Sequence, residues 1–392
     1  MKEIDSLKDF KKWIKRGIPH KAAIQELNLK TFDAEILKNS FKSCLFLGCK
    51  VSDIAAGRIS NTGGIVIPNR QEFLFKIHRA FLYTPKELFQ GFDFNSKNGY
   101  LQTVDYKIYK EYIQTGMETP DSIAVSLSRR LHDHSITDAL YELIEGRKVV
   151  AIMGGHSMER RNPFYKKIAL ISRSLTKKGY LIVSGGGPGA MEAAHLGAFF
   201  AYRTKNELNN AIDILKIRPT GAKPNKEYAD YDWLKRAWIV KEKYPIPKGY
   251  KKKSTSIGIP TYLYGHEPPT LFATHIAKYF ANSVREDGLL TIAKNGVIFA
   301  PGSTGTIQEI FQDATQNHYA PYNDKKGNKK QVSPMILFGK KRWKKEKPVW
   351  DLIKSVANGQ VYDELLHLTD EVKKTIQIIE QYDEKKYQFP KD

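Results

Sequence analysis

The sequence predicts an α/β protein with a doubly wound, mostly parallel sheet and an additional N-terminal α+β domain. Two observations support this prediction. From Gly146 onward, short apolar runs alternate with helix-like segments, as parallel strands joined by crossover helices do. Two of the runs end in glycine-rich loops that open a helix, which is typical of ligand sites in such sheets. A length of 392 residues favours two domains, which we place at 1–140 and 141–385.

The predicted elements of the second domain follow one another along the chain. Strands are expected where short apolar runs stand between turn signals, at residues 149–153, 180–183, 256–259, 296–299 and 334–338. Helices are expected at 163–178, 191–202, 269–285 and 306–316. Residues 204–253, rich in Lys, Asn, Pro and Tyr, interrupt this alternation and are interpreted as an insertion on one face of the sheet.

The first domain shows no clear alternation of strands and helices. Apolar runs at 44–47 and 64–67 stand among helix-like segments such as 71–82. Its two cysteines, Cys44 and Cys49, are too few for a disulfide framework, which favours a reducing compartment. We expect an accessory domain whose role the residues leave open.

The composition is that of a globular protein. Hydrophobic residues make up 41% and charged residues 27%, and no apolar run approaches the roughly 20 residues that a membrane helix needs. The N-terminus lacks the apolar block of a secretory signal. We therefore expect a cytoplasmic protein that does not bind membranes.

The charge balance is the one unusual feature of the composition. The chain has 63 Lys and Arg against 42 Asp and Glu, a formal net charge of +21. This favours anionic partners. The excess is scattered, mostly as lysine, rather than gathered with aromatic residues along one element, which argues against a dedicated nucleic-acid face. Small phosphorylated ligands fit the same balance.

A glycine-rich loop follows the predicted strand at 180–183 and opens a helix. It comprises Ser184, Gly185, Gly186, Gly187, Gly189 and Ala190. Backbone N–H groups and a helix N-terminus at such a junction can bind a phosphate. The spacing also fits a dinucleotide fingerprint, but the acidic residue expected at the end of the next strand is missing. A turn that only packs strand against helix is the structural alternative.

A second loop of this kind follows the predicted strand at 296–299. It comprises Gly302, Ser303, Thr304, Gly305 and Thr306. Consecutive parallel strands place such loops side by side at their carboxyl ends, so we expect the two loops to share a ligand. Glu309 is expected in the first turn of the following helix, where the alternative role is a charge favoured by the helix dipole.

The predicted strand at 149–153 adds a third piece to the same edge. It ends in Gly154 and Gly155, and His156 follows, so we expect these residues to bind the ligand as well. The ten histidines show no metal-ligand spacing, and His132 and His134 are expected in a polar loop before a helix at 137–144. No metal and no cofactor are predicted.

Together these motifs resemble the LOG family. The resemblance rests on GGGPGAM at 185–191 and PGSTGTIQE at 301–309, while MGGHS at 153–157 is similar to the longer bacterial nucleotide 5'-monophosphate nucleosidases. It covers residues 130–380 well and 1–130 weakly. It implies a Rossmann-like fold and a phosphoribohydrolase that releases a free base and ribose 5-phosphate from a nucleoside 5'-monophosphate. It further implies a homo-oligomer, at least a dimer.

The resemblance implies that Glu309 and Arg285 form a catalytic pair. Glu309 ends the second motif, and Arg285 stands where the family has its arginine, on the preceding helix. A surface arginine near a helix C-terminus is the alternative for Arg285. Ser303 replaces the family's second glycine, so its side chain would narrow the phosphate pocket or donate a hydroxyl to it.

The residue types suit cleavage of an N-glycosidic bond. The reaction passes through an oxocarbenium-like ribose, which Glu309 could stabilise while it orients or activates the attacking water. Arg285 would fix the ribose or phosphate, or polarise the departing base. Met191, at the start of the helix after the first loop, would line the base or ribose pocket.

Two other functions stay open at this point. A nucleotide sensor without activity would use the same loops, and the unassigned first domain would report the ligand. A protein that binds single-stranded DNA would use the positive charge and would lose affinity steeply with salt. A lysine decarboxylase is not favoured, because no Schiff-base lysine stands in a cofactor-binding context.

Overall fold

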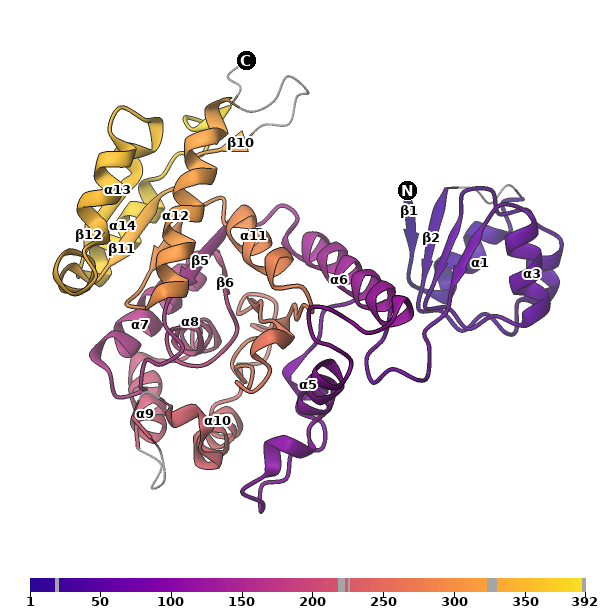
Figure 1. Ribbon diagram of the computed structural model, residues 1–392, viewed down its shortest axis with the longest axis horizontal. Coiled ribbons are helices and arrows are strands. Elements are labelled where there is room, and N and C mark those ends of the chain that lie inside the picture. The colour runs from indigo at the N-terminus through magenta and orange to yellow at the C-terminus, as the bar shows by residue number, and fades with distance from the viewer. Residues whose placement is uncertain (18–20, 218–222, 225, 323–329, 390–392) are drawn as a thin grey trace. The chain divides into compact units, whose positions relative to one another are not determined.

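The structure is a computed structural model that describes all residues except 18–20, 218–222, 225, 323–329 and 390–392 (Figure 1). The chain forms two compact units. Unit 1 comprises Met1–Leu82 and Lys107–Leu143, and unit 2 comprises Tyr83–Tyr106 and Ile144–Asp392. Residues 83–106, N-terminal to the boundary expected near residue 140, are thus part of unit 2.

Unit 1 is built on four short parallel strands. They are β1 (Lys2–Ile4), β2 (Ala22–Gln25), β3 (Leu45–Leu47) and β4 (Ile65–Ile67), paired in the order β1-β2-β3-β4. The helices α1 (Leu7–Ile14), α2 (Asp33–Leu37) and α3 (Asp53–Asn61) connect them in turn. A strand–helix alternation therefore exists here, although the sequence shows none clearly. Three- and four-residue strands are too short to leave a periodic signal.

Two further elements of unit 1 differ from expectation. The helix expected at 71–82 is absent, since the described backbone there forms turns and bends. His132 and His134 lie inside the long helix α6 (Ile123–Ile144), so the predicted polar loop is wrong. His132 is buried, and its Nδ1 lies 3.0 Å from Oδ1 of Asp133. The polar residues of this segment were interpreted as a loop, but they belong to a helix with a buried face. Cys44 and Cys49 are buried, and neither forms a disulfide.

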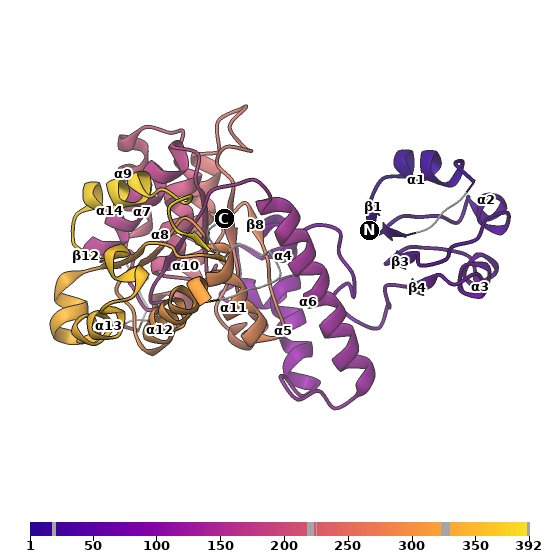
Figure 2. The ribbon, with the colours of Figure 1, turned by 90° about the horizontal axis from the view of Figure 1, so that it is seen from above.

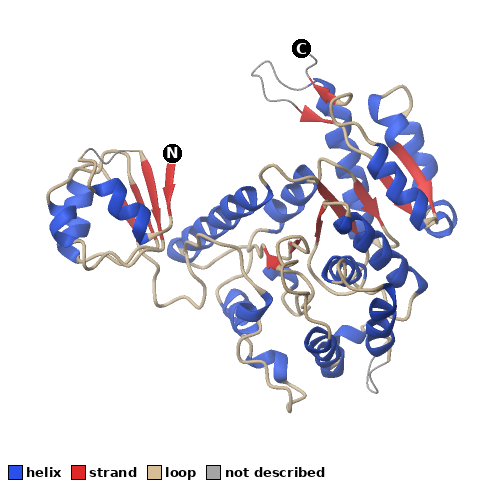
Figure 3. Ribbon diagram, turned by 180° about the vertical axis from the view of Figure 1, so that it is seen from behind, coloured by secondary structure: helices blue, strands red, loops and turns tan. Residues whose placement is uncertain are grey.

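Unit 2 contains a seven-stranded sheet in which every pairing is parallel, confirming the predicted fold class (Figure 3). The order is β12-β11-β9-β5-β6-β7-β8. The strands are β5 (Val149–Met153), β6 (Leu181–Ser184), β7 (Ser256–Gly258), β8 (His275–Ile276), β9 (Val297–Phe299), β11 (Met335–Phe338) and β12 (Leu366–Thr369). Two residues each from β10 (Lys330–Gln331) and β13 (Gln388–Phe389) form a small antiparallel ladder beside it.

Helices cover both faces of this sheet, as double winding requires (Figure 2). One group is α7 (Pro163–Lys177), α8 (Ala190–Phe199) and α14 (Val372–Gln381); the other is α11 (Asn282–Ile292), α12 (Thr304–Tyr319) and α13 (Val349–Ala357). The remaining helices include α4 (Pro85–Leu88), α5 (Val104–Gln114), α9 (Lys205–Leu215) and α10 (Tyr231–Lys243). Among the helices that the structure describes, none has the length and apolar character to cross a membrane.

The predicted helix at 269–285 is wrong. Its middle is the edge strand β8, whose Ile276 N–H donates to the carbonyl of Tyr83, while Ala277 N–H donates to Gly258. Prolines at the start of the segment, Pro268 and Pro269, are compatible with a first helical turn, so the pairing of β8 decides the structure of this segment. The helix α11 begins only at Asn282, so Arg285 lies in its first turn rather than at a helix C-terminus.

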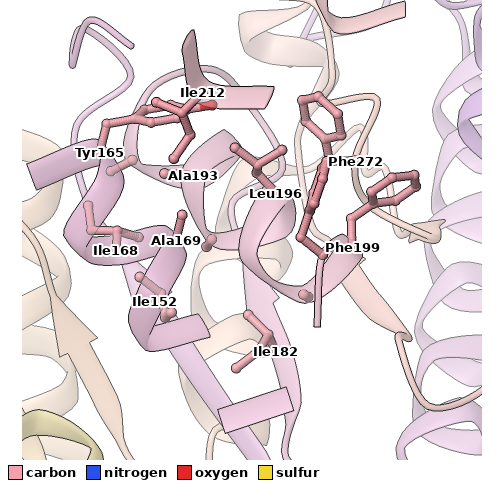
Figure 4. Close-up of a cluster of buried hydrophobic side chains, with 14 of the residues drawn as sticks. Ile152, Tyr165, Ile168, Ala169, Ile182, Ala193, Leu196, Phe199, Ile212 and Phe272 are labelled. Carbon is pink, nitrogen blue, oxygen red and sulfur yellow. The ribbon is translucent and has the colours of Figure 1, made fainter. Parts of the chain in front are cut away.

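The core of unit 2 is densest where α7 and α8 pack on β5 and β6 (Figure 4). Ile152 and Ile182 of the strands face Ile168, Ala169, Ala193 and Leu196 of the helices. A Cβ atom on Gly197 would lie 2.2 Å from the carbonyl oxygen of Ala169, so glycine is required for the close approach of the two helices. This packing fixes the start of α8, which follows the carboxyl end of β6.

A buried ion network ties the expected insertion to the sheet. The guanidinium of Arg160 donates to both carboxylate oxygens of Glu192 and to the carbonyl of Trp233, and its backbone N–H donates to Glu227. The hydroxyl of Tyr165 donates to Glu192 as well. Residues 204–253 therefore form helices α9 and α10 anchored on unit 2, apart from 218–222 and 225, which lie outside the described residues.

Removing one partner of this network should destabilise unit 2. We expect Glu192→Ala to lower the free energy of unfolding by about 3–5 kcal/mol, because Arg160 would stay buried without its counter-charge. Glu242→Ala, on an exposed position of α10, should change it by no more than about 0.5 kcal/mol. Urea unfolding followed by tryptophan fluorescence measures both, and equal midpoints would contradict the structural role of Glu192.

Candidate functional site

The strand order places a crevice at the carboxyl end of β5. From β5 the chain proceeds through β6, β7 and β8 toward one edge of the sheet, while β9, β11 and β12 lie on the other side. Ligands of open α/β sheets bind where the strand order reverses in this way. The two glycine loops expected to come from neighbouring strands in fact follow β6 and β9, and β5 lies between them. The loop after β5 therefore joins them.

Glycine backbones make the contacts between these three loops. Gly155 N–H donates to the carbonyl of Pro301 at 3.2 Å, and its own carbonyl accepts from Ala190 at 3.1 Å. A Cβ on Gly154 would lie 2.7 Å from Cβ of Ala190, and one on Gly155 would lie 3.2 Å from Cα of Gly302. The loops can approach this closely only because these positions lack side chains.

Two helices begin at this edge without a side-chain cap. Ser303 is the N-cap of α12 and Gly189 is the N-cap of α8, and neither position supplies a capping hydrogen bond from a side chain. The first turn of α12, with Thr304, Gly305 and Thr306, contains no acidic residue. Free N–H groups and the positive end of the helix dipole at such a turn bind anions.

Glu309 lies one turn further along α12 than expected. The helix starts at Thr304, so Glu309 belongs to its second turn and the prediction of the first turn is wrong. Its Oε1 lies 3.8 Å from Nη1 of Arg285, and the two side chains are only 14% and 11% exposed. The helix dipole acts mainly on the first turn, so it does not account for a glutamate in the second turn of α12.

Arg285 is held against the first glycine loop. Its Nε donates to the carbonyl of Ile259 at 2.9 Å, directly after β7. A Cβ on Gly185 would lie 2.5 Å from Nη2 of Arg285 and 2.5 Å from Sδ of Met191. The structure thus brings Gly185, Met191, Arg285 and Glu309 together, although they come from three separate segments of the chain.

The carboxyl of Glu309 has a strongly shifted pKa. Burial raises the pKa of Glu309 to about 7, the positive charge of Arg285 opposes this shift, and the nearby Glu286 adds to it. The group is thus divided between its acid and its carboxylate near neutral pH. A carboxyl in this range can exchange protons with a reacting molecule at physiological pH.

Glu267 is a second carboxyl at this site, and the sequence analysis missed it. Its Oε2 would lie 3.5 Å from a Cβ on Gly187, and its side chain is 13% exposed. Burial raises the pKa of Glu267, while His266 and Arg285 lower it. The only sequence signal is its position just before Pro268 and Pro269, in a segment wrongly predicted to be a helix.

His156 and Tyr228 surround Glu267. Nδ1 of His156 lies 3.8 Å from Oε1 of Glu267, and the His156 and Tyr228 rings form an edge-on contact with centroids 5.9 Å apart. Burial and the neighbouring charge of Glu267 raise the pKa of Tyr228. Burial lowers the pKa of His156, so its imidazole is neutral at pH 7.

Several residues expected to bind ligand make contacts that hold the loops together. Oγ of Ser184 donates to the carbonyl of Ile152 at 2.6 Å. The carbonyl of Gly186 accepts from Thr270, and the N–H of Ala190 donates to Gly155. Gly189 has a positive φ of 67° and no room for a Cβ beside the carbonyls of Gly155 and His156. Their role for a ligand stays a prediction.

A polar cavity of about 610 Å³ borders the second glycine loop. Gly302 and Ser303 form part of its wall, together with Ser157 from the loop after β5. Arg161, Lys341 and Arg342 bring positive charge to it, partly balanced by Glu159 and Glu346. Nε of Arg342 donates to the carbonyl of Gly302 at 3.0 Å, which braces the loop from this side.

A metal centre has no support in the part of the chain that the structure describes. Within it, no three His, Cys, Asp or Glu side chains gather as a metal ion would require. The polar groups at the crevice are those that bind oxyanions, namely backbone N–H groups, a guanidinium and hydroxyls.

The fold and the loop contacts define unit 2 as a doubly wound α/β domain in which three glycine-containing loops meet at the carboxyl ends of β5, β6 and β9. No family model matches the sequence, and no curated protein matches it either. Among solved structures, the molybdenum cofactor binding protein from Rippkaea orientalis and the molybdenum cofactor carrier protein from Chlamydomonas reinhardtii are each 13% identical, with TM-scores of 0.36. Each alignment covers 60% of this chain and 97% of the other. The structural genomics target TM1055 is 19% identical with a TM-score of 0.35, over 60% and 99%.

The cradle can be tested at Gly302. A Cβ there would lie 2.0 Å from Oγ1 of Thr306 and 3.1 Å from N of Gly155, so Gly302→Ala should push the loops apart. We expect the dissociation constant for a nucleoside monophosphate to rise at least about tenfold by calorimetry, a loss of about 1.4 kcal/mol. Gly288→Ala on α11, where a Cβ meets no atom within 4 Å, is the matched control. Equal affinity of both variants would show that this loop does not hold the ligand.

Proposed function

We propose that the protein is a nucleoside 5'-monophosphate phosphoribohydrolase of the LOG type. It would hydrolyse the N-glycosidic bond and release a free base and ribose 5-phosphate. The observation that carries this proposal is the buried Arg285–Glu309 pair, set beside the uncapped start of α12. An anion cradle and a carboxyl with a pKa of about 7 are the two parts that this reaction needs.

The start of α12 and the glycine loop before it would bind the 5'-phosphate of the substrate. The first turn of α12 offers N–H groups and the positive end of its dipole to the 5'-phosphate. Ser303 adds a hydroxyl at the rim, where the LOG pattern has a glycine. The neighbouring cavity with Arg161, Lys341 and Arg342 adds positive potential on the same side.

The pair accounts for the chemistry at the anomeric carbon. Glu309 as a carboxylate stabilises the positive charge that develops on the ribose and takes a proton from water as the new C–O bond forms. The C–N bond breaks with its electrons going to the base, which then needs a proton. Glu267, a second carboxyl with a raised pKa, faces the same loop and can supply it.

In this scheme Arg285 positions the ribose or phosphate of the substrate, or polarises the departing base. Its guanidinium presents several hydrogen-bond donors in a fixed plane. Because Nε is already bonded to Ile259, the Nη groups remain directed toward Gly185 and Glu309. Lysine could not reproduce this arrangement, since it has one ammonium group and no fork.

Purified protein should release base and ribose 5-phosphate from at least one nucleoside monophosphate in a panel of purines and pyrimidines. Glu309→Ala should lower kcat by about 100- to 10,000-fold, the usual contribution of a general acid or base. Thr315→Ala, at an exposed position of the same helix, serves as the control. Binding without any release by the wild-type protein would favour the sensor and reject the enzyme.

The pH dependence of the reaction should report Glu309. The carboxylate of Glu309 is the active form, so kcat/KM should fall about tenfold per pH unit below the pKa of about 7, and it should fall again at higher pH once Glu267 loses the proton that it supplies to the base. Glu309→Gln cannot lose a proton, so its residual activity should lack this step. Stopped assays from pH 5 to 9 measure the profile. A wild-type profile in which kcat/KM stays constant between pH 5 and pH 7 would contradict this role.

A further inference from the structure

A second cavity of about 290 Å³ lies in unit 2 beside Glu267. It is lined mainly by ring and apolar side chains, among them Phe92, Tyr100, Tyr106, Tyr228, Leu234 and His266. The rings of Tyr100 and Tyr106 lie 5.5 Å apart in an edge-on contact, so the wall is a packed aromatic surface. Such surfaces bind nucleobases by stacking, which is worth about 1–3 kcal/mol per base.

The aromatic cavity and the catalytic crevice share a wall. Tyr228 lines the cavity and also contacts His156 and Glu267, which belong to the crevice. His266 lines the cavity as the immediate neighbour of Glu267. A base that departs from the anomeric carbon toward Glu267 would therefore lie next to the aromatic rings of this cavity.

The two cavities differ in the chemistry that they offer. The polar cavity borders Gly302 and Ser303 and carries arginine and lysine, as a phosphate would need. The aromatic cavity borders Tyr228 and His266 and is poorer in charge, with Lys97 and Asp230 as its ionisable rim residues apart from His266. Phosphate and base of one nucleotide would thus find separate, matching surroundings.

We propose that the aromatic cavity is the base subsite of this enzyme, with Lys97 and Asp230 as specificity-determining residues. This inference rests on the proposed function. Lys97 can only donate a hydrogen bond, while Asp230 can accept one. Oδ1 of Asp230 already accepts from the N–H of Asp232, which leaves Oδ2 for the base edge. A base that offers an acceptor to Lys97 and a donor to Asp230 fits this lining.

This assignment links base choice to parts of the chain outside the LOG-like motifs. Phe92 to Tyr106 precede β5, and Tyr228 to Leu234 belong to the stretch interpreted as an insertion. Both segments lie outside the glycine loops proposed to hold the phosphate. The subsite would therefore let base preference change while the bond-cleaving pair stays the same.

The test fills the cavity from its exposed rim. Ala229→Trp should raise KM for the preferred monophosphate at least about tenfold and leave the affinity for ribose 5-phosphate, which has no base, within twofold. Ile239→Trp is the matched control, because it is exposed on α10 and does not line the cavity. Asp230→Asn, which keeps an oxygen for the helix cap, should change the ranking of bases rather than kcat for all of them.

The outcomes separate this inference from the proposed function. An unchanged KM and base ranking in Ala229→Trp and Asp230→Asn, with an active wild type, would overturn the base subsite alone. A parallel loss of ribose 5-phosphate affinity in Ala229→Trp would also overturn it, because the cavity would then not be specific for the base. If the wild type cleaves no monophosphate, the proposed function fails, and the same variants are compared by calorimetric binding of the monophosphate.

Discussion

The backbone contact between the three loops around Gly155 is the constraint on which the rest of unit 2 depends. Gly155 is bonded on one side to Pro301 and on the other to Ala190, so the loops after β5, β6 and β9 form one surface. Any side chain at Gly154, Gly155 or Gly302 would separate them. Because the loops are continuous with parallel strands, the position of the anion cradle is fixed by the sheet itself.

Buried charge gives this surface its chemistry. Arg285 is fixed by Ile259, and this keeps a positive charge near Glu309 without forming a close ion pair. Burial therefore outweighs the attraction, and the pKa of Glu309 rises instead of falling. At Arg160 the balance is the opposite: burial opposes its charge, but the close pairing with both carboxylate oxygens of Glu192 outweighs burial and raises the pKa of Arg160.

Much of the fold followed from local sequence patterns. The strands of unit 2 with several β-branched residues, such as β5, and the helices α7 and α12 lie close to where the pattern placed them. The strands β3 and β4 fall on the apolar runs at 44–47 and 64–67, whereas the segment at 269–285 and the strands β1 and β2 did not follow from such patterns. Their structure depends on pairing with Tyr83, Gly258 or neighbouring strands, and no local window contains those partners.

The sequence by itself determined the kinds of chemistry available: glycines before helix starts, an arginine, and a glutamate after the second loop. Only the tertiary structure decided which of them meet, because strand order is set by packing between distant segments. That order put β5 between the two glycine loops, moved Arg285 to a helix start, and brought Glu267 and Tyr228 beside them. The pKa of Glu309 likewise follows from burial, which no single stretch of sequence encodes.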